Sequence, residues 1–546
     1  MKRIERIQGT IVDVQHKRMF KGSIHIKDKK IVSVEEHDCE ESHYILPGFI
    51  DAHVHIESSM LTPVEFARQA VQHGTVATVS DPHEIANVCG LQGIDYMIEN
   101  AKSAFLKIYF GAPSCVPATS FETAGANLGI EETKALLKRN DIHYLSEMMN
   151  FPAVIANHPE VMAKINLAHR YQKKVDGHAP GVRGEKAKKY IEAGISTDHE
   201  CVHLDEALEK IRYGMKIIIR EGSAAKNFEA LHTLIDTHTN DCMLCSDDKH
   251  PDDFIEGHID SLVKRALNKG FDLYKVLQVA CINPVHHYRL NNGLLQVGDA
   301  ADFIVVNNLK DFNILQTVIN AQVLYENKKC FIPSVSSSTI NNFYDNKISP
   351  EKIKVDVKGS TIRVIEAIDG QLITNETSAT VFSENNNAIS DTKNDILKMV
   401  LINRYAESEA SIAFIKNFGL KKGAIASTVA HDSHNIIALG CSDKEICEAI
   451  NLLIESKGGL SYFDFEQAEV QSLPVAGLMS TETCAEVALR YKQLNQLCVN
   501  AGCKLKAPYM TLSFMALLVI PSLKLSDKGL FDGNRFSFTS LFTDEN

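Results

Sequence analysis

The strongest constraint on the fold is a regular alternation of strand-like and helix-like segments between about residue 46 and residue 290. Short apolar runs alternate with amphipathic segments every 20 to 40 residues or so, roughly the spacing of repeated strand–helix units. Eight such units in about 245 residues match an α/β fold of the TIM-like (β/α)8 barrel type in number and in length. The predicted strands end near His55, Ser80, Gly111, Glu147, His178, His199, Arg220 and Asp247.

Amphipathic segments fill the intervals between these strands. Several of them begin with proline or carry acidic residues in the first turn, as the N-termini of helices favour. The predicted helices cover residues 63–73, 131–139, 160–172, 184–193, 204–213 and 226–237.

Two strand-rich segments flank the middle part of the chain. Residues 10–34 alternate apolar and polar side chains between short polar turns, and a similar pattern returns at residues 293–306. We therefore expect one small β-domain that is assembled from both flanks, followed by a C-terminal domain of mixed strands and helices. The predicted domains are a β-sandwich-like domain of residues 1–46 with 291–345, the barrel of residues 47–290, and an α+β domain of residues 351–546.

Composition argues against several classes of protein. The net charge is −12, and lysine and arginine are scattered along the chain, so no basic stripe suggests binding to nucleic acid. No run of about 18 uncharged apolar residues is present, and the N-terminus lacks the apolar core of a signal peptide. The 13 cysteines lack the dense spacing of a small secreted scaffold and fit a reducing compartment. We expect a cytoplasmic protein that binds neither nucleic acid nor a membrane.

Polar residues gather where the predicted barrel strands end, and barrels place their functional groups at that edge. The first strand ends in His53 and His55, which share one side because strand side chains alternate. An isolated pair of this kind fits a polar strand end as well as a metal site, so the other strand ends decide. They add Glu147, His178, His199 and Asp247. Imidazole and carboxylate groups on one rim predict a site for Zn²⁺, Fe²⁺, Mn²⁺ or a similar divalent ion.

Further titratable groups have less certain roles. His83 and Glu84 follow the second strand and fit either the first turn of a helix or an additional metal or substrate contact. Glu200, directly after His199, stays open between the same two roles. In the last domain, the spacing of His431 and His434 would place both rings on one metal if the segment were helical. Their flanks predict strands around a polar turn, so a structural turn is favoured, one able to close over the barrel mouth.

Longer motifs around these residues resemble the amidohydrolase superfamily and, within it, the adenine deaminases of the bacterial type. The resemblance extends over nearly the whole chain. Its motifs are LPGFIDAHVHIE at 46–57, SDPHEIANVCG at 80–90, SEMMN at 146–150, DGHAPG at 176–181, DHEC at 198–201, SDDKHP at 246–251, VAHDSHNI at 429–436, PVAGLMS at 474–480 and the segment 520–532.

The resemblance implies hydrolysis of the 6-amino group of adenine, which gives hypoxanthine and ammonia. It implies adenine and water as partners, a homo-oligomer such as a dimer, and two divalent ions per subunit, Mn²⁺ or Fe²⁺ with Zn²⁺ as an alternative. The expected metal ligands are His53, His55, Glu147, His178, His199 and Asp247. A bound ion supplies hydroxide near pH 7, and a carboxylate must carry the proton to the leaving nitrogen.

We assign that proton transfer to Asp247, with Asp248 in reserve or facing the purine, and we expect Glu147 to bridge the ions. Related hydantoinase-like and dihydroorotase-like enzymes typically carry a carbamylated lysine at the bridging position. The glutamate found here argues against those activities.

Two alternatives stay open, namely another amidohydrolase acting on a cyclic amide or a different aminoheterocycle, and a non-catalytic scaffold with this fold. An intact ligand set speaks against the scaffold. A zinc site of the cytidine-deaminase type is rejected, because its H-x-E half at 55–57 and a C-x-x-C at 242–245 lie far apart and Asp241 stands where that motif has proline.

Overall fold

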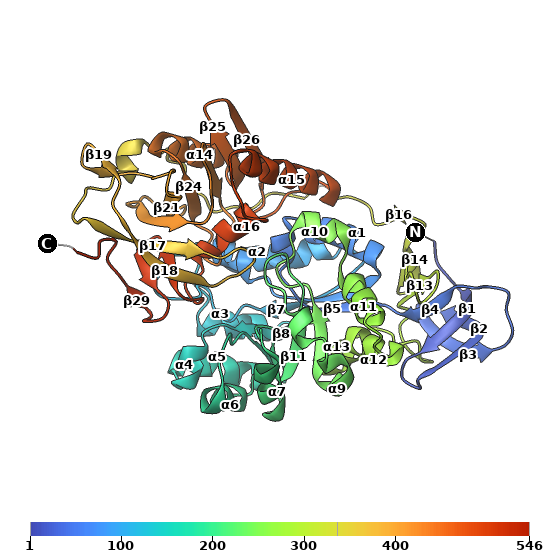
Figure 1. Cartoon of the computed structure of the whole chain (residues 1–546). Coiled ribbons are helices and arrows are strands. Elements are labelled where there is room, and N and C mark those ends of the chain that lie inside the picture. The colour runs from blue at the N-terminus through green and yellow to red at the C-terminus, as the bar shows by residue number, and fades with distance from the viewer. Residues whose placement is uncertain (1, 336, 545–546) are drawn as a thin grey trace.

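A computed structural model of the chain describes residues 2–335 and 337–544. The barrel lies in the middle of the molecule, with a small β-domain on one side of it and the C-terminal domain packed across its upper part (Figure 1). The N-terminal strands and the strands that follow the barrel lie together at the right of this view. The predicted fold class is confirmed.

Eight parallel strands form the barrel. Five of them hydrogen-bond in the order β5 to β9, and three more in the order β10 to β12. A bridge between Val54 and Asp247 closes the ring, and the Ser196 N–H donates to Val175 O at 2.9 Å where the two sheets meet. The strands are β5 (Phe49–Val54), β6 (Thr75–Ser80), β7 (Lys107–Ala112), β8 (Ile142–Met148), β9 (Lys174–Gly177), β10 (Thr197–Asp198), β11 (Lys216–Arg220) and β12 (Cys242–Cys245). All eight predicted strands are therefore present.

Helices connect the strands on the outside of the barrel. They are α1 (Pro63–Ala70), α2 (His83–Ala101), α3 (Ile130–Leu137), α4 (Phe151–Ile155), α5 (Pro159–Arg170), α6 (Gly184–Glu192), α7 (Leu204–Arg212), α8 (Phe228–Leu231), α9 (Leu234–Thr237), α10 (Pro251–Glu256), α11 (Ile259–Asn268), α12 (Leu273–Leu277) and α13 (Asn283–Tyr288). The single helix predicted over 226–237 is wrong, because α8 and α9 are separate. Apolar spacing did not reveal the break, since Phe228, Leu231, Leu234 and Ile235 are buried on both sides of it.

The small β-domain is one sheet of eight strands, ordered β16-β15-β14-β13-β4-β1-β2-β3. β4 pairs with β1 on one edge and with β13 on the other, so the two flanks of the barrel join at β4. From β4 the chain passes through Gly48, where a Cβ atom would lie only 2.1 Å from Val76 Cγ1, and enters β5. The strands are β1 (Arg6–Asp13), β2 (Arg18–Lys27), β3 (Lys30–Glu36), β4 (Tyr44–Pro47), β13 (Phe303–Val306), β14 (Ile314–Ile319), β15 (Gln322–Glu326) and β16 (Lys329–Cys330).

The C-terminal domain is built on a second eight-stranded sheet, ordered β18-β17-β22-β21-β24-β23-β25-β26. Its strands are β17 (Thr361–Ala367), β18 (Thr374–Thr380), β21 (Ile396–Ile402), β22 (Ser411–Lys416), β23 (Ala424–Ser427), β24 (Ile436–Gly440), β25 (Gly459–Asp464) and β26 (Gln467–Ser472). The remaining elements are β19 (Ser383–Glu384), β20 (Asn387–Ala388), α14 (Asp443–Ser456), α15 (Cys484–Asn500), α16 (Pro508–Ser513), β27 (Leu523–Ser526), β28 (Gly529–Asp532) and β29 (Ser537–Phe538). The domain is α+β, as predicted.

The C-terminal domain covers the barrel at the end where the strands finish. The Ser480 N–H donates to Met60 O at 2.8 Å, and Asn435 Nδ2 donates to Thr123 O at 2.9 Å. Buried apolar residues of the barrel and of this domain belong to one continuous core. The loop between β23 and β24 is thereby held against the barrel mouth.

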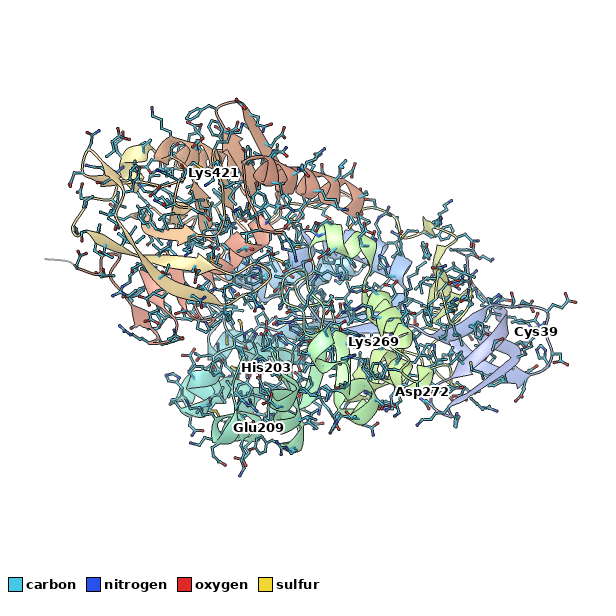
Figure 2. All side chains as sticks on the ribbon, in the orientation of Figure 1. Cys39, His203, Glu209, Lys269, Asp272 and Lys421 are labelled. Atoms are coloured by element: carbon cyan, nitrogen blue, oxygen red, sulfur yellow. The ribbon has the colours of Figure 1, made fainter. Side chains whose placement is uncertain are left out.

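Figure 2 shows side chains on all three parts of the molecule, with Cys39 in the small β-domain and Lys421 in the C-terminal domain. Every one of the 13 cysteines has a free thiol in the structure, which describes all of them. Within residues 2–335 and 337–544, no helix is long and apolar enough to cross a membrane.

Candidate metal centre

Backbone pairing between the first and last barrel strands positions Asp247. Its N–H donates to His53 O at 3.0 Å. The preceding Ser246 is tied down as well, because its N–H and its hydroxyl both donate to the carboxylate of Asp51, which also contacts His258 Nε2 at 2.8 Å. Asp247 has a φ of 51°, a left-handed conformation that is uncommon outside glycine and often found at functional sites.

The six residues predicted as metal ligands converge on one buried rim. Asp247 Oδ1 lies 3.3 Å from His53 Nε2 and 3.2 Å from His55 Nε2. Glu147 Oε1 lies 3.2 Å from His55 Nε2, while its Oε2 lies 2.9 Å from His178 Nδ1 and 3.3 Å from His199 Nε2. Glu147 therefore faces three of the histidines with its two oxygens.

These distances fit a shared ion. Two atoms bound at about 2.0 to 2.1 Å to one tetrahedral ion lie about 3.3 Å apart, which is longer than a hydrogen bond of about 2.9 Å. Four of these five pairs are separated by 3.2 or 3.3 Å, and the fifth, between His178 and Glu147, is at the hydrogen-bond length of 2.9 Å. Among the described residues, neither ring nitrogen of His53 has a hydrogen-bond partner although the side chain is buried. The donor set and its spacing fit a divalent metal ion.

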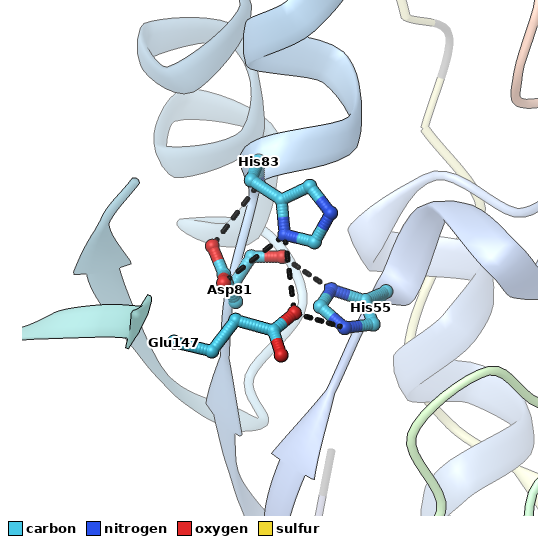
Figure 3. Close-up of side chains that lie close together, drawn as sticks. All are labelled: His55, Asp81, His83 and Glu147. Carbon is cyan, nitrogen blue, oxygen red and sulfur yellow. Dashed lines mark hydrogen bonds and ion pairs between the residues drawn. The ribbon is translucent and has the colours of Figure 1, made fainter. Parts of the chain in front are cut away.

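Hydrogen bonds behind the rim orient its side chains. His55 Nδ1 donates to the backbone oxygen of Asp81 at 3.1 Å, which turns Nε2 toward the carboxylates, as in many metal sites (Figure 3). His83 Nδ1 lies 3.1 Å from Asp81 Oδ2 and 3.5 Å from Glu147 Oε1. His83 thus stands beside the Glu147 carboxylate, on the first turn of α2.

Arg220 also belongs to the rim, although the sequence analysis placed it at a strand end without giving it a role. Its Nη1 donates to Asp247 Oδ2 at 2.7 Å, and its Nη2 donates to Glu200 Oε2 at 3.1 Å. Glu200 Oε1 in turn lies 3.3 Å from His199 Nε2. A cation at the C-terminal end of a barrel strand was the signal that could have revealed it.

The two adjacent carboxylates of the rim are electrostatically distinct. Burial raises the pKa of Asp247, but Arg220 and the neighbouring histidines outweigh burial and hold that pKa well below its usual range. Burial together with the charge of Asp247 raises the pKa of Asp248. Asp248 accepts a hydrogen bond from Ser58 Oγ at 2.5 Å. Paired groups whose pKa values are driven apart are typical of acid–base sites, and Asp247 is the ionised member.

Glu84 joins the barrel to the C-terminal domain. His431 Nδ1 lies 2.6 Å from Glu84 Oε1, and His434 Nε2 contacts Glu84 Oε2. Burial lowers the pKa of His431, but Glu84 outweighs this effect and raises the pKa to about 9. The structure thus places His431 and His434 over the barrel mouth, on a carboxylate of the rim.

A small cavity separates the rim from the C-terminal domain. Its volume is about 20 Å³, which is space for about one water. Apolar side chains form one wall of it, namely Met149, Leu372, Phe514 and Leu517. The polar wall includes the rim residues together with Glu84, His431 and Asp432. A ligand larger than water requires these side chains to move.

A parallel eight-stranded barrel with histidines, a glutamate and an aspartate gathered at its strand ends defines a hydrolase of the amidohydrolase class. The chain matches the amidohydrolase family over residues 44–324 and the adenine deaminase C-terminal domain over residues 371–537. Membership of this class implies a divalent metal.

Relatives narrow this assignment. The chain is 53% identical to an adenine deaminase of Methanosarcina mazei, over 99% of this chain and 100% of that protein. It is 53% identical to one of Sulfurovum sp. over 97% and 98% of the two chains, and 49% identical to one of Salinibacter ruber over 98% and 99%. The chain belongs to the adenine deaminase family, and the resemblance read from its motifs is confirmed.

Proposed function

We propose that this protein hydrolyses adenine to hypoxanthine and ammonia at the barrel rim. The observation that carries the proposal is the complete set of four histidines, Glu147 and Asp247 in one buried cluster. A scaffold that had lost catalysis would be free to lose these ligands. The family relationship supports adenine as the substrate.

We propose that the six rim residues hold two divalent ions, Mn²⁺ or Fe²⁺, with Zn²⁺ as an alternative. Mixed imidazole and carboxylate ligands suit these ions. Glu147 supports a two-ion site because its oxygens face different histidines, His55 on one side and His178 with His199 on the other. When bound, such ions lower the pKa of water and so supply hydroxide near pH 7.

Asp247 is the proton-transfer group in this proposal. One of its oxygens faces the rim, and Arg220 holds the other at 2.7 Å, so the carboxylate stays ionised and oriented. It accepts a proton from the attacking water and passes it to the 6-amino nitrogen, which leaves as ammonia. The second water proton ends on ring nitrogen N1, because hypoxanthine carries a carbonyl at C6 and an N–H at N1.

The metabolic role, the location and the oligomeric state of the protein are also proposed here. We propose a role in purine salvage and adenine catabolism, since hypoxanthine is the product, and a cytoplasmic location, which the 13 free thiols support. The homodimer expected from the sequence stays a prediction, which light scattering of the purified protein would check.

Ultraviolet assays of metal-loaded protein test the proposal with adenine, adenosine, guanine and cytosine side by side. We expect a spectral change and ammonia release with adenine alone. Unchanged adenine spectra after loading with Fe²⁺, Mn²⁺ and Zn²⁺ would refute the function but not the fold. Turnover of another base in place of adenine would move the proposal to a different aminoheterocycle.

A further inference from the structure

We propose that His431 and Asp432 of the C-terminal domain form the recognition site for the azole N–H edge of a free purine base. This inference rests on the function proposed above and explains how the site would distinguish a free base from a nucleoside. Both residues lie in the loop between β23 and β24, which covers the barrel mouth.

The side chains of His431 and Asp432 line the cavity opposite the rim residues. Asp432 Oδ1 lies 3.8 Å from His83 Nε2, which places the carboxylate next to the residues around Glu147. The ring of His431 stacks on Phe514 with a centroid distance of 4.5 Å and an interplanar angle of 11°. A base entering between the rim and this loop would therefore meet an aromatic wall and two polar groups.

Each residue has a buried polar atom that lacks a hydrogen-bond partner. In the part of the chain that the structure describes, His431 Nε2 and Asp432 Oδ2 have none. Both side chains are nearly inaccessible, at 2% and 3% exposure. Buried polar groups are almost always paired, because an unpaired one is costly, so these two atoms mark a place for a polar ligand.

Glu84 fixes the orientation of this loop. The Ala430 N–H donates to His434 Nδ1 at 3.2 Å, so Nδ1 is an acceptor and the ring proton of a neutral His434 is on Nε2. That proton is donated to Glu84 Oε2, and the Nδ1–H of His431 is donated to Oε1 at 2.6 Å. The 2.6 Å separation is a hydrogen-bond length, shorter than the separation of about 3.3 Å between two ligands of one ion.

In this inference Glu84 is a positioning residue of the barrel, and its two oxygens hold the rings of His431 and His434. With Nδ1 held by Glu84, His431 presents its other nitrogen to the cavity. The purine-facing atoms of the C-terminal domain are in this way aligned by a carboxylate of the barrel.

The two unpaired buried atoms match a free base. A carboxylate only accepts hydrogen bonds, so Asp432 Oδ2 suits the azole N–H of adenine. The cationic form of His431, which the adjacent Glu84 carboxylate favours, also carries a proton on Nε2 and can donate it to a neighbouring ring nitrogen. In a nucleoside the N9 position carries ribose, which removes that donor and adds bulk to an enclosed cavity. Sites built to bond one substrate hydrogen strongly reject analogues that lack it.

The test compares adenine with 9-methyladenine as substrates of the metal-loaded enzyme and of Asp432→Asn. We expect the wild-type protein to prefer adenine by more than about 100-fold in kcat/KM. Asp432→Asn should raise the KM for adenine about 10-fold or more and change kcat less, because a charge-assisted hydrogen bond is weakened. The ratio of kcat/KM for adenine to that for 9-methyladenine should fall. Asp356→Asn, on the exposed surface of the same domain, is the matched control and should behave as wild type.

Metal content and product binding complete the test. Glu84→Gln should raise the KM for adenine in the same direction while retaining the wild-type metal content. An unchanged KM and preference in Asp432→Asn, or loss of metal in Glu84→Gln, would overturn the inference and leave the deaminase function standing. If the wild-type protein did not turn over adenine, the proposed function would be refuted. Calorimetry with hypoxanthine and 9-methylhypoxanthine would still decide whether Asp432 accepts a hydrogen bond from the azole N–H.

Discussion

Replacing Asp247 by asparagine tests the role assigned to the most constrained residue of the rim. In the structure one carboxylate oxygen lies 3.2 to 3.3 Å from His55 and His53, and the other accepts from Arg220 at 2.7 Å. An amide presents an N–H₂ group to one of these sides, so it either opposes the Arg220 donor or faces the rim with the wrong group. In both orientations the side chain is a neutral amide, which cannot accept the proton of the attacking water as the carboxylate does.

Removing a positioned proton-transfer group typically lowers the rate by about 10² to 10⁴, which corresponds to about 3 to 5 kcal/mol in the barrier. We expect Asp247→Asn to lower kcat for adenine by that factor, with most of the metal retained because five other ligands remain. The assay is the steady-state change in adenine absorbance, with metal content measured on the same samples. Asp248→Asn is the neighbouring comparison and should lose less activity, since Asp248 contacts Ser58. Near-normal kcat in Asp247→Asn, or a larger loss in Asp248→Asn, would refute the assignment.

Two further variants probe buried charges. Arg220→Met should lower kcat about 10- to 100-fold with little change in the KM for adenine, because Glu200 and Asp247 lose the cation that they share. Steady-state kinetics would measure this loss, and circular dichroism would show whether the variant is folded. Burial lowers the pKa of Lys524 to about 7 from its ordinary value of 10.5, so the unfolded chain binds the proton more tightly over this range. The stability of the wild-type fold should therefore gain about 1.4 kcal/mol per pH unit from this group between pH 7 and pH 10, and Lys524→Met should lack that gain in urea unfolding.

Much of the barrel and its rim follows from local sequence. Each barrel strand is an apolar run that stops at polar residues, and in a parallel barrel the strand ends meet at one edge. The sequence alone therefore groups His53, Glu147 and Asp247. The split between α8 and α9 could not be predicted, because the apolar face of the helix continues across the break.

The contacts that complete the site depend on residues far apart in the sequence. Glu84 and His431 are separated by 347 positions, and no spacing rule connects a carboxylate on α2 with a loop of the C-terminal sheet. Arg220 was overlooked for a different reason, since it ends a predicted strand but its partners Glu200 and Asp247 come from the two neighbouring strand ends. The pairing of Glu84 with His431 is set by the packing of the C-terminal domain on the barrel, and the contacts of Arg220 are set by the closure of the barrel itself.

The most direct test of the central claim is a titration of chelator-treated protein with Mn²⁺, in which adenine turnover is followed against metal equivalents per subunit. The account predicts negligible turnover without metal, a rise that saturates at two equivalents, and hypoxanthine and ammonia in equal amounts. Full adenine turnover in the metal-free protein, or no turnover at any loading, would contradict it.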